Sequence, residues 1–219
     1  MSLAILIPYR PDNDRRARIY AATSRLWADR GVEADVEVIH SGDGLRGEFS
    51  YSRAANRARA KTDAQCLITY SVDALPLSAQ FLQRIEAQLC AGLPWSCIFA
   101  GQQRFTPEQT GVIFDGGDPG PAAGQICMGR EALMAVRADV WDELRGMDER
   151  FVGWGAEDMA FYKVLSTVYP QGCDVPTEGL FQSLWHPETS RLAWWGNVEL
   201  MRRYDEPPPD ELKAWYLAR

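Results

Sequence analysis

The chain has 219 residues and a formal net charge of −7 at pH 7, from 30 acidic and 23 basic side chains. The length suits one domain with a sizeable core, and the acidic balance argues against nucleic acid as a bulk partner. No run of about 18 apolar residues is present, so no membrane span is expected. Because the chain lacks a basic, apolar leader, we expect a cytoplasmic protein with reduced cysteines.

The first forty residues predict a β-α-β unit. The apolar run 3–8 is typical of a strand buried on both faces of a mostly parallel sheet. A helix is predicted from Asp14 to a stop at Gly31, and a second strand at 36–39. In doubly wound sheets of this kind, ligands bind beyond the carboxyl ends of the strands. We therefore expect residues 8–10 and 40–43 at a cleft.

The next segments continue the alternation. A helix begins near Tyr51, with an apolar face of small residues and arginines on its other sides. Residues 66–70 predict a third strand, which runs into Ser71-Val72-Asp73 and a further helix at 81–89. The simplest interpretation of Asp73 is a turn residue or helix cap before Pro76.

The pattern is lost after residue 95. A short strand is predicted at 98–100, but residues 105–124 contain too many glycines and prolines for regular structure. A loop of this length inside a domain is usually functional or disordered, and we expect it to be a lid or to lie on the acceptor side. A strand at 132–137, a helix capped by Asp139 and a strand at 172–175 are expected beyond it. Two final helices, 192–204 and 212–217, are separated by three prolines.

The segment 146–158 carries the chemistry. Glu157 and Asp158 are expected in the first turn of a helix, where acids complement the helix dipole by roughly 0.3–1 kcal/mol. The preceding Gly153-Trp154-Gly155 places an aromatic ring between two backbone-permissive residues, which favours a ring lying along a cleft. An indole beside paired carboxylates suits a sugar site, because the ring stacks on the C–H face and the acids accept from hydroxyls.

A family resemblance rests on these residues. The string GMDERFVGWGAEDMAF resembles the G-F-D-E-x-F-x-G-W-G-G-E-D element of GT-A-fold glycosyltransferases, above all the β-1,4-galactosyltransferase, polypeptide N-acetylgalactosaminyltransferase and chondroitin polymerase group. Ala156 stands where the group has glycine. The segment 7–10 resembles the group's I-P-[FY]-R start, and 49–56 its F-x-x-x-R-A-x-x-N segment. The resemblance implies an α/β GT-A fold with a mostly parallel, helix-flanked central sheet, which we place at 1–206, followed by a helical tail at 207–219.

The resemblance also implies roles for single residues. It places Pro8, Tyr9, Arg10, Arg53 and Asn56 on the nucleotide, and Asp73 and His186 on a divalent cation, Mn²⁺ before Mg²⁺. Ser71 replaces the first acid of the group's Asp-x-Asp, so that Asp73 is left as the direct carboxylate ligand. The acceptor side is assigned to the following residues: Trp154 and Gly155 on the sugar, Glu157 orienting the acceptor, and Asp158 as general base.

The predicted function is metal-dependent transfer of a hexose or N-acetylhexosamine from a nucleotide-diphosphate sugar, UDP-sugar by resemblance, to an acceptor hydroxyl. Inversion is expected, although the retaining N-acetylgalactosaminyltransferases share the W-G-G-E element and keep retention open. The first alternative is a non-catalytic carbohydrate-binding or virion-associated protein. The second is a sugar nucleotidyltransferase, which would need a glycine-rich loop that residues 8–11 do not provide. The acceptor (glycan, protein, lipid or modified nucleic acid) and the oligomeric state stay open.

Overall fold

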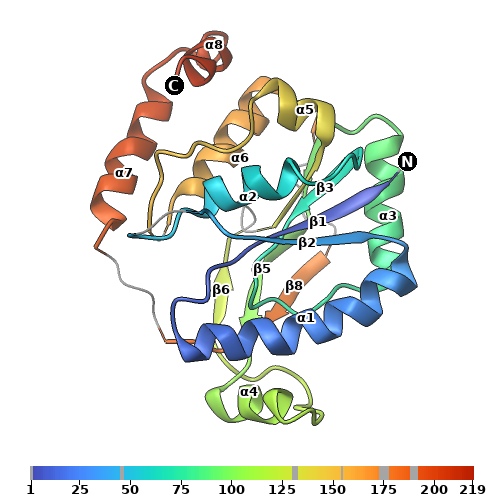
Figure 1. Cartoon of the computed structure of the whole chain (residues 1–219). Helices are drawn as coiled ribbons and strands as arrows, with labels where there is room; N and C mark the ends of the chain where they lie inside the picture. Colours follow the sequence, from blue (N-terminus) through green and yellow to red (C-terminus); the bar gives the residue numbers. More distant parts are fainter. Residues whose placement is uncertain (1, 45–46, 130–132, 154, 173–177, 188–191) are drawn as a thin grey trace.

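A computed structural model describes residues 2–44, 47–129, 133–153, 155–172, 178–187 and 192–219. Its centre is a five-stranded sheet in the order β2-β1-β3-β7-β4 (Figure 1). The bounds of these strands are β1 Leu3–Pro8, β2 Glu37–Ser41, β3 Cys66–Thr69, β4 Trp95–Cys97 and β7 Met134–Arg137. Every residue of β1 and β3 is buried, as expected for strands covered on both faces.

The prediction of a mostly parallel sheet is only partly correct. β1 pairs in parallel with β2 and β3, which confirms the opening unit, but β7 runs antiparallel to both β3 and β4. The chain returns to the central sheet from a second, three-stranded sheet and enters it from the opposite end. The α/β class is therefore confirmed, and the sheet is mixed.

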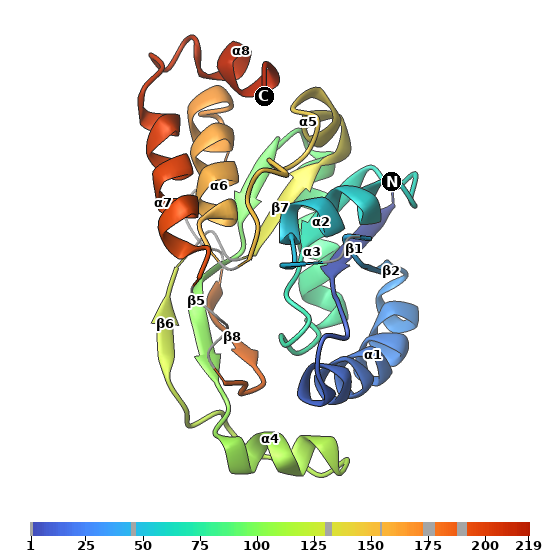
Figure 2. The ribbon, with the colours of Figure 1, turned by 60° about the vertical axis from the view of Figure 1, so that its left-hand side comes forward.

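The second sheet has the order β6-β5-β8 and stands beside the first (Figure 2). It contains β5 Phe99–Arg104, β6 Ile126–Met128 and β8 Glu178–Ser183. Since β4 ends at Cys97 and β5 begins at Phe99, one almost continuous run of chain passes from the central sheet into the second one.

Helices cover both faces of the central sheet. The side chains of Leu3, Ile5 and Ile7 pack with α1 (Asp14–Ala34) and α3 (Ala79–Cys90), whereas Ala4 and Leu6 point to the other face. That face is covered by α2 (Tyr51–Arg59), α5 (Ala138–Glu143) and α6 (Glu157–Val168), and α8 (Leu212–Leu217) belongs to the same core. The alternation along β1 thus supplies two hydrophobic cores.

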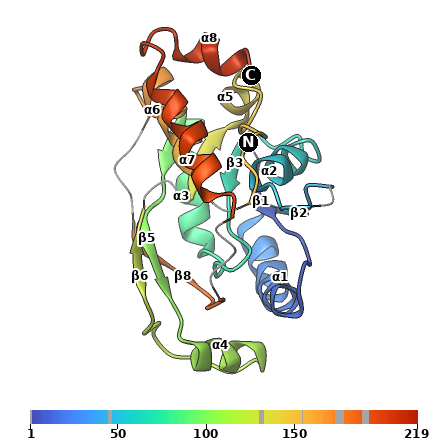
Figure 3. The same ribbon diagram turned by 90° about the vertical axis from the view of Figure 1, so that its left-hand side faces the viewer.

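The C-terminal part lies against α6 (Figure 3). It consists of α7 (Trp194–Arg202), a single turn at Arg203–Asp205 and α8, so both predicted helices are confirmed. Leu212 and Tyr216 are buried in the α6 core. The boundary after residue 206 stays a prediction. Within the described part of the chain, no helix has the length and apolar character needed to cross a bilayer.

Three predictions of local structure are corrected. Helix α1 continues past Gly31, and Asp35, in the left-handed conformation with φ 54°, ends it. Helix α5 begins at Ala138 without a side-chain cap from Asp139. The segment 105–124 contains α4 (Pro107–Phe114), which begins with a capping box between Thr106 and Gln109. Of the strand predicted at 172–175, only Gly172 lies within the described residues, and the next strand is β8.

Candidate active site

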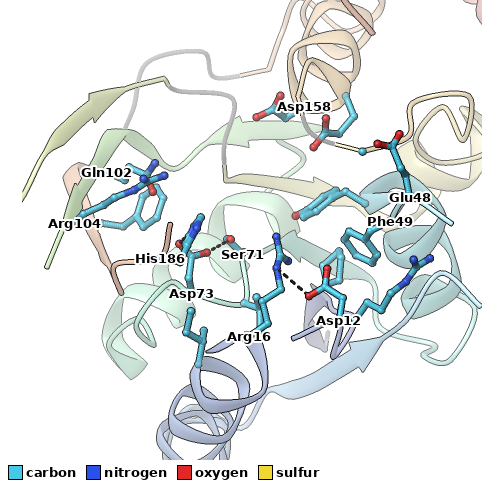
Figure 4. Close-up of a pocket in the computed structure, with 18 of the residues that line it drawn as sticks. Asp12, Arg16, Glu48, Phe49, Ser71, Asp73, Gln102, Arg104, Asp158 and His186 are labelled. Atoms are coloured by element: carbon cyan, nitrogen blue, oxygen red, sulfur yellow. Dashed lines mark hydrogen bonds and ion pairs between the residues drawn. The ribbon is translucent and has the colours of Figure 1, made fainter. Parts of the chain in front are cut away.

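A cavity of about 380 Å³ opens beyond the carboxyl ends of β1 and β3, between the second sheet and the beginning of α6 (Figure 4). The topological rule that placed residues 8–10 near a cleft is consistent with this position. Six of the residues predicted from the sequence line the cavity: Pro8, Arg10, Asp73, Glu157, Asp158 and His186.

One wall carries a carboxylate and an imidazole side by side. Asp73 follows β3 and His186 follows β8, and the distance from His186 Nε2 to Asp73 Oδ2 is 3.5 Å. The backbones of the two segments are also joined, because the Leu184 N–H donates to the carbonyl of Asp73 at 2.8 Å. The Ser71 hydroxyl donates to the other carboxylate oxygen. Asp73 is only 7% exposed.

The charges of this pair are mutually stabilised. Burial raises the pKa of Asp73, but the hydrogen bonds from His186 and Ser71 outweigh it and hold that pKa below its usual value. The hydrogen bond to Asp73 raises the pKa of His186. The Asp73 carboxylate is an oxygen donor of the kind that suits Mn²⁺ or Mg²⁺, and the His186 imidazole beside it is a ligand for transition metals. Among the described residues, no group of three or more His, Cys, Asp or Glu side chains that could hold a metal ion occurs.

The opposite side carries the second pair of acids at the beginning of α6, as Figure 4 shows for Asp158. Burial, and then the charge of Asp158, raise the pKa of Glu157 to about 8. Its Oε2 atom is buried without a hydrogen-bond partner in the described structure. The Tyr51 ring also faces the cavity, and burial together with the charges of Glu157 and Asp158 raises the pKa of its hydroxyl. Glu157 is therefore the acid of the pair that holds its proton near neutral pH.

The loop that leads into α6 is fixed by α7. Gly155 has φ 101°, and a Cβ there would lie 2.5 Å from Trp194 Cζ3, so only glycine fits under this ring. The carbonyl of Gly155 accepts from the side chain of Asn197 at 3.0 Å. Gly155 does not line the cavity, although Gly153 does. Trp154, predicted to stack on a sugar, lies outside the described residues.

Arg10 is oriented at the rim of the cavity by an acid that we did not assign from the sequence. Its guanidinium donates to Asp43 Oδ1 from Nε at 3.1 Å and from Nη2 at 2.6 Å, and it lies 5.5 Å from the ring centre of Phe49. Asp43 is 1% exposed and also accepts from the Ser50 N–H. Tyr9 does not line the cavity: its ring stacks on Tyr20 of α1, with centroids 4.1 Å apart.

The structure does not bring Arg53 and Asn56 to the cavity. Arg53 Nε lies 3.3 Å from Glu149 Oε2. The Asn56 side chain donates to the carbonyl of Met147 at 2.9 Å and accepts from the Met147 N–H at 2.9 Å. Both residues of α2 therefore brace the segment that precedes the Glu157–Asp158 pair.

Two other arginines line the cavity instead, Arg16 of α1 and Arg104 of β5. Arg16 lies 3.4 Å from Asp12 Oδ1. The Nε atom of Arg104 is buried and has no hydrogen-bond partner among the described residues. Sequence reasoning missed Arg104 because β5 was predicted to end at residue 100. Arg16 gave no signal beyond its position in the first turn of a helix that follows the cleft strand.

The chain has the fold of the GT-A glycosyltransferases. The catalytic domain of Drosophila β1,4-galactosyltransferase 7, solved with xylobiose, matches it with a TM-score of 0.61 at 18% sequence identity, over 94% of this chain and 82% of that chain. A mutant of that enzyme, solved with manganese, UDP-Gal and xylobiose, matches with a TM-score of 0.51 at 18% identity, over 80% and 65%. Comparisons with protein-family models and with curated proteins give no match.

Proposed function

We propose that the chain is a glycosyltransferase that moves a hexose or N-acetylhexosamine from a UDP-sugar to an acceptor hydroxyl with a divalent cation, Mn²⁺ or Mg²⁺. The observation that carries this proposal is the opposition of two pairs across one cavity, Asp73 with His186 and Glu157 with Asp158. The similar Drosophila galactosyltransferase was solved with manganese and UDP-Gal, which supports the same chemistry here.

On the donor side, Asp73 and His186 would hold the cation. A bound cation neutralises the charge that develops on the departing diphosphate. We assign the phosphate contacts to Arg16 and Arg104 rather than to Arg53, because these two arginines line the cavity and the Arg104 Nε has no hydrogen-bond partner within the described part of the chain. An arginine fork suits two phosphate oxygens at once. Pro8 and Arg10, at the rim, remain the candidates for the nucleoside.

On the acceptor side, Glu157 and Asp158 would have different roles. Asp158 would act as the general base that takes the proton of the attacking hydroxyl. Glu157 would be protonated at neutral pH and donate its proton in a hydrogen bond to a sugar oxygen, which gives its buried Oε2 a partner. Neighbouring carboxyls with different proton affinities are a common basis for such separate roles. A base on the acceptor side favours direct displacement with inversion.

The test of the proposal is a calorimetric titration of UDP into the protein with and without Mn²⁺. The titration is repeated on Asp73→Ala and on Asp118→Ala, an exposed acid of the 115–120 loop. We expect Mn²⁺-dependent binding that Asp73→Ala abolishes and Asp118→Ala keeps. A screen of UDP-sugars then follows, in which Asp158→Asn should keep UDP binding and lose roughly 10²–10⁴-fold in transfer rate. Full transfer activity in Asp158→Asn would disprove the assigned base.

A non-catalytic carbohydrate-binding protein is the second candidate, since Ser71 replaces an acid at the cation site. Its hydroxyl hydrogen-bonds one oxygen of Asp73, which leaves that carboxylate fewer lone pairs for a cation. Glycan binding without hydrolysis or transfer of any UDP-sugar would favour this candidate over the enzyme.

A further inference from the structure

The chain at the end of β8 is hydrogen-bonded on its cavity side to the segment 73–75, which begins with the proposed cation ligand Asp73. The Leu75 N–H donates to the carbonyl of Gln182 at 2.9 Å, and the Leu184 N–H donates to the carbonyl of Asp73 at 2.8 Å. These bonds fix the strand up to residue 184. The position of His186 then depends on the two peptide groups that flank Trp185.

The N–H of the first of these peptide groups and the carbonyl of the second are each held from the other side by a side chain. The Trp185 N–H donates to the hydroxyl oxygen of Thr110, at 2.9 Å, and Thr110 of α4 is completely buried. The Trp185 carbonyl accepts from Arg15 Nη2 of α1 at 3.1 Å. The guanidinium of Arg15 also lies 4.5 Å from the centre of the Trp185 ring and 5.5 Å from that of Phe114.

The segment that contains α4 is itself firmly anchored. The Phe105 N–H donates to the carbonyl of Ser183 at 2.9 Å, and α4 lies beside α1 at the foot of the second sheet (Figure 2). The Gln109 side chain donates to the carbonyls of Pro119, at 3.0 Å, and Pro121, at 2.7 Å. Residues 105–124 are therefore a braced structure and not the irregular loop that their composition predicts.

We propose that Thr110 and Arg15 are positioning residues, and that residues 105–124 form a clamp that holds His186 against Asp73. The role as a cation ligand rests on the proposed function, whereas the clamp itself concerns the placement of His186. Rotation of the peptide groups that flank Trp185 would carry the imidazole away from Asp73. Mutation of a residue that orients a metal ligand typically weakens metal binding by roughly 10–100-fold.

The test compares Thr110→Val, which keeps the shape and removes the acceptor, with Thr110→Ser, which restores it. Gln109→Ala is the matched control, because it loosens the same helix and its loop without touching Trp185. The first readout is the dissociation constant for Mn²⁺ in the presence of UDP. We expect it to weaken by at least about tenfold in Thr110→Val, to recover most of its wild-type value in Thr110→Ser and to stay unchanged in Gln109→Ala.

The second readout is independent of the metal. The chain has two histidines, so the imidazole C–H NMR signals of the metal-free protein are assigned with a His40→Gln variant. At fixed pH, Thr110→Val should shift or broaden the His186 signal and leave that of His40 in place. Wild-type Mn²⁺ affinity in Thr110→Val would overturn the inference. If the wild type itself binds no Mn²⁺, the proposed function fails, and the NMR signals alone decide: an unmoved His186 signal overturns the clamp.

Discussion

At the scale of single residues, the central motif shows why its composition is unusual. Ala156 adopts φ 73°, the left-handed conformation, and is the residue that precedes the first turn of α6. A side chain in this conformation costs roughly 1–2 kcal/mol relative to glycine, which explains why similar glycosyltransferases have glycine there. In this chain the Ala156 methyl is buried in the core of α6, and that contact offsets part of the strain.

We predict that the effect of Ala156 substitutions on the free energy of unfolding depends on backbone strain and not on side-chain hydrophobicity. Ala156→Gly should change the free energy of unfolding by less than about 1 kcal/mol, because relief of strain and loss of a buried methyl oppose each other. Ala156→Val should cost at least about 2 kcal/mol, since a β-branched residue at positive φ is a genuine outlier. Urea unfolding of the three proteins measures both values. A valine variant as stable as the wild type would contradict this description of the loop.

A second prediction concerns the proton on Glu157. Burial raises its pKa from the usual 4.5 to about 8 in the folded protein, so the folded state binds this proton more tightly than the unfolded chain. The stability that this proton contributes is complete below about pH 4.5 and is lost as the pH rises to about 8. Glu157→Gln, which cannot lose a proton, should therefore gain stability relative to the wild type between pH 5 and pH 8.5.

Thermal unfolding of both proteins across that pH range gives the comparison. The transfer rate of the wild type should fall above about pH 8 as the Glu157 proton is lost. If the stability difference between wild type and Glu157→Gln does not change with pH, Glu157 is ionised throughout and cannot donate the hydrogen bond assigned to it.

At the scale of elements, the hydrophobic pattern of the sequence predicted those helices and strands whose apolar residues form a clear local pattern. The hydrophobic pattern located β1 and β3 as continuous apolar runs, and α1, α3 and α6 by apolar faces that repeat with the period of a helix. It missed α4, whose length of eight residues and flanking glycines hide the pattern. The stretch Thr106-Pro107-Glu108-Gln109 nevertheless carries a capping box with proline at the first helical position, and that signal could have revealed the helix.

Among the residues predicted from the motifs, the structure brings Asp73 and Glu157 to the cavity, whereas Arg53 and Asn56 of α2 do not line it. Asp73 and Glu157 reach the cavity because strand ends and the start of α6 converge there. The direction of Arg53 depends on Glu149, a partner 96 positions away that no local pattern reveals. The antiparallel direction of β7 could not be predicted for a similar reason. It depends on the end from which the chain returns to the central sheet, and no local pattern reveals that.

The contact between α7 and the motif loop gives a prediction at this scale. Asn197 is 4% exposed, and its Nδ2 donates to the carbonyls of Val152, at 2.9 Å, and Gly155, at 3.0 Å. Asn197→Ala should cost about 1–3 kcal/mol of stability, because buried carbonyls lose their donor. It should also raise the KM for the acceptor, measured by initial rates.

Glu199→Ala, on an exposed position of the same helix, is the matched control and should leave both the stability and the KM unchanged. Equal KM values in the two variants would mean that α7 does not shape the acceptor side.

At the scale of the whole molecule, the C-terminal residues are packed into the core of the domain. Asp148 is 3% exposed, accepts from the Tyr204 hydroxyl at 2.6 Å and pairs with Arg150 at 2.7 Å. The Tyr216 hydroxyl donates to the carbonyl of Gly146 at 2.8 Å. These bonds connect the beginning of the central motif to the end of the described chain.

Removal of residues 207–219 should therefore destabilise the domain by at least about 3 kcal/mol, through the loss of buried Leu212 and Tyr216. Differential scanning calorimetry of the truncated protein measures the loss, with Lys213→Ala as a control that removes a surface ion pair with Glu143 and a contact with the Tyr169 ring but no buried side chain. If truncation leaves the melting temperature unchanged, residues 207–219 are a separate tail, as the proline-rich boundary predicts.

The run of chain from β4 into β5 has a consequence for how the site opens. Ile98, fully buried between the two strands, joins the sheet that carries Asp73 to the sheet that carries Arg104 and, beyond β8, His186. If either sheet separated from the other, Ile98 would lose its buried position. The donor side should therefore have no low-energy partial unfolding of its own, and its slowest backbone amides should exchange with solvent only through global unfolding.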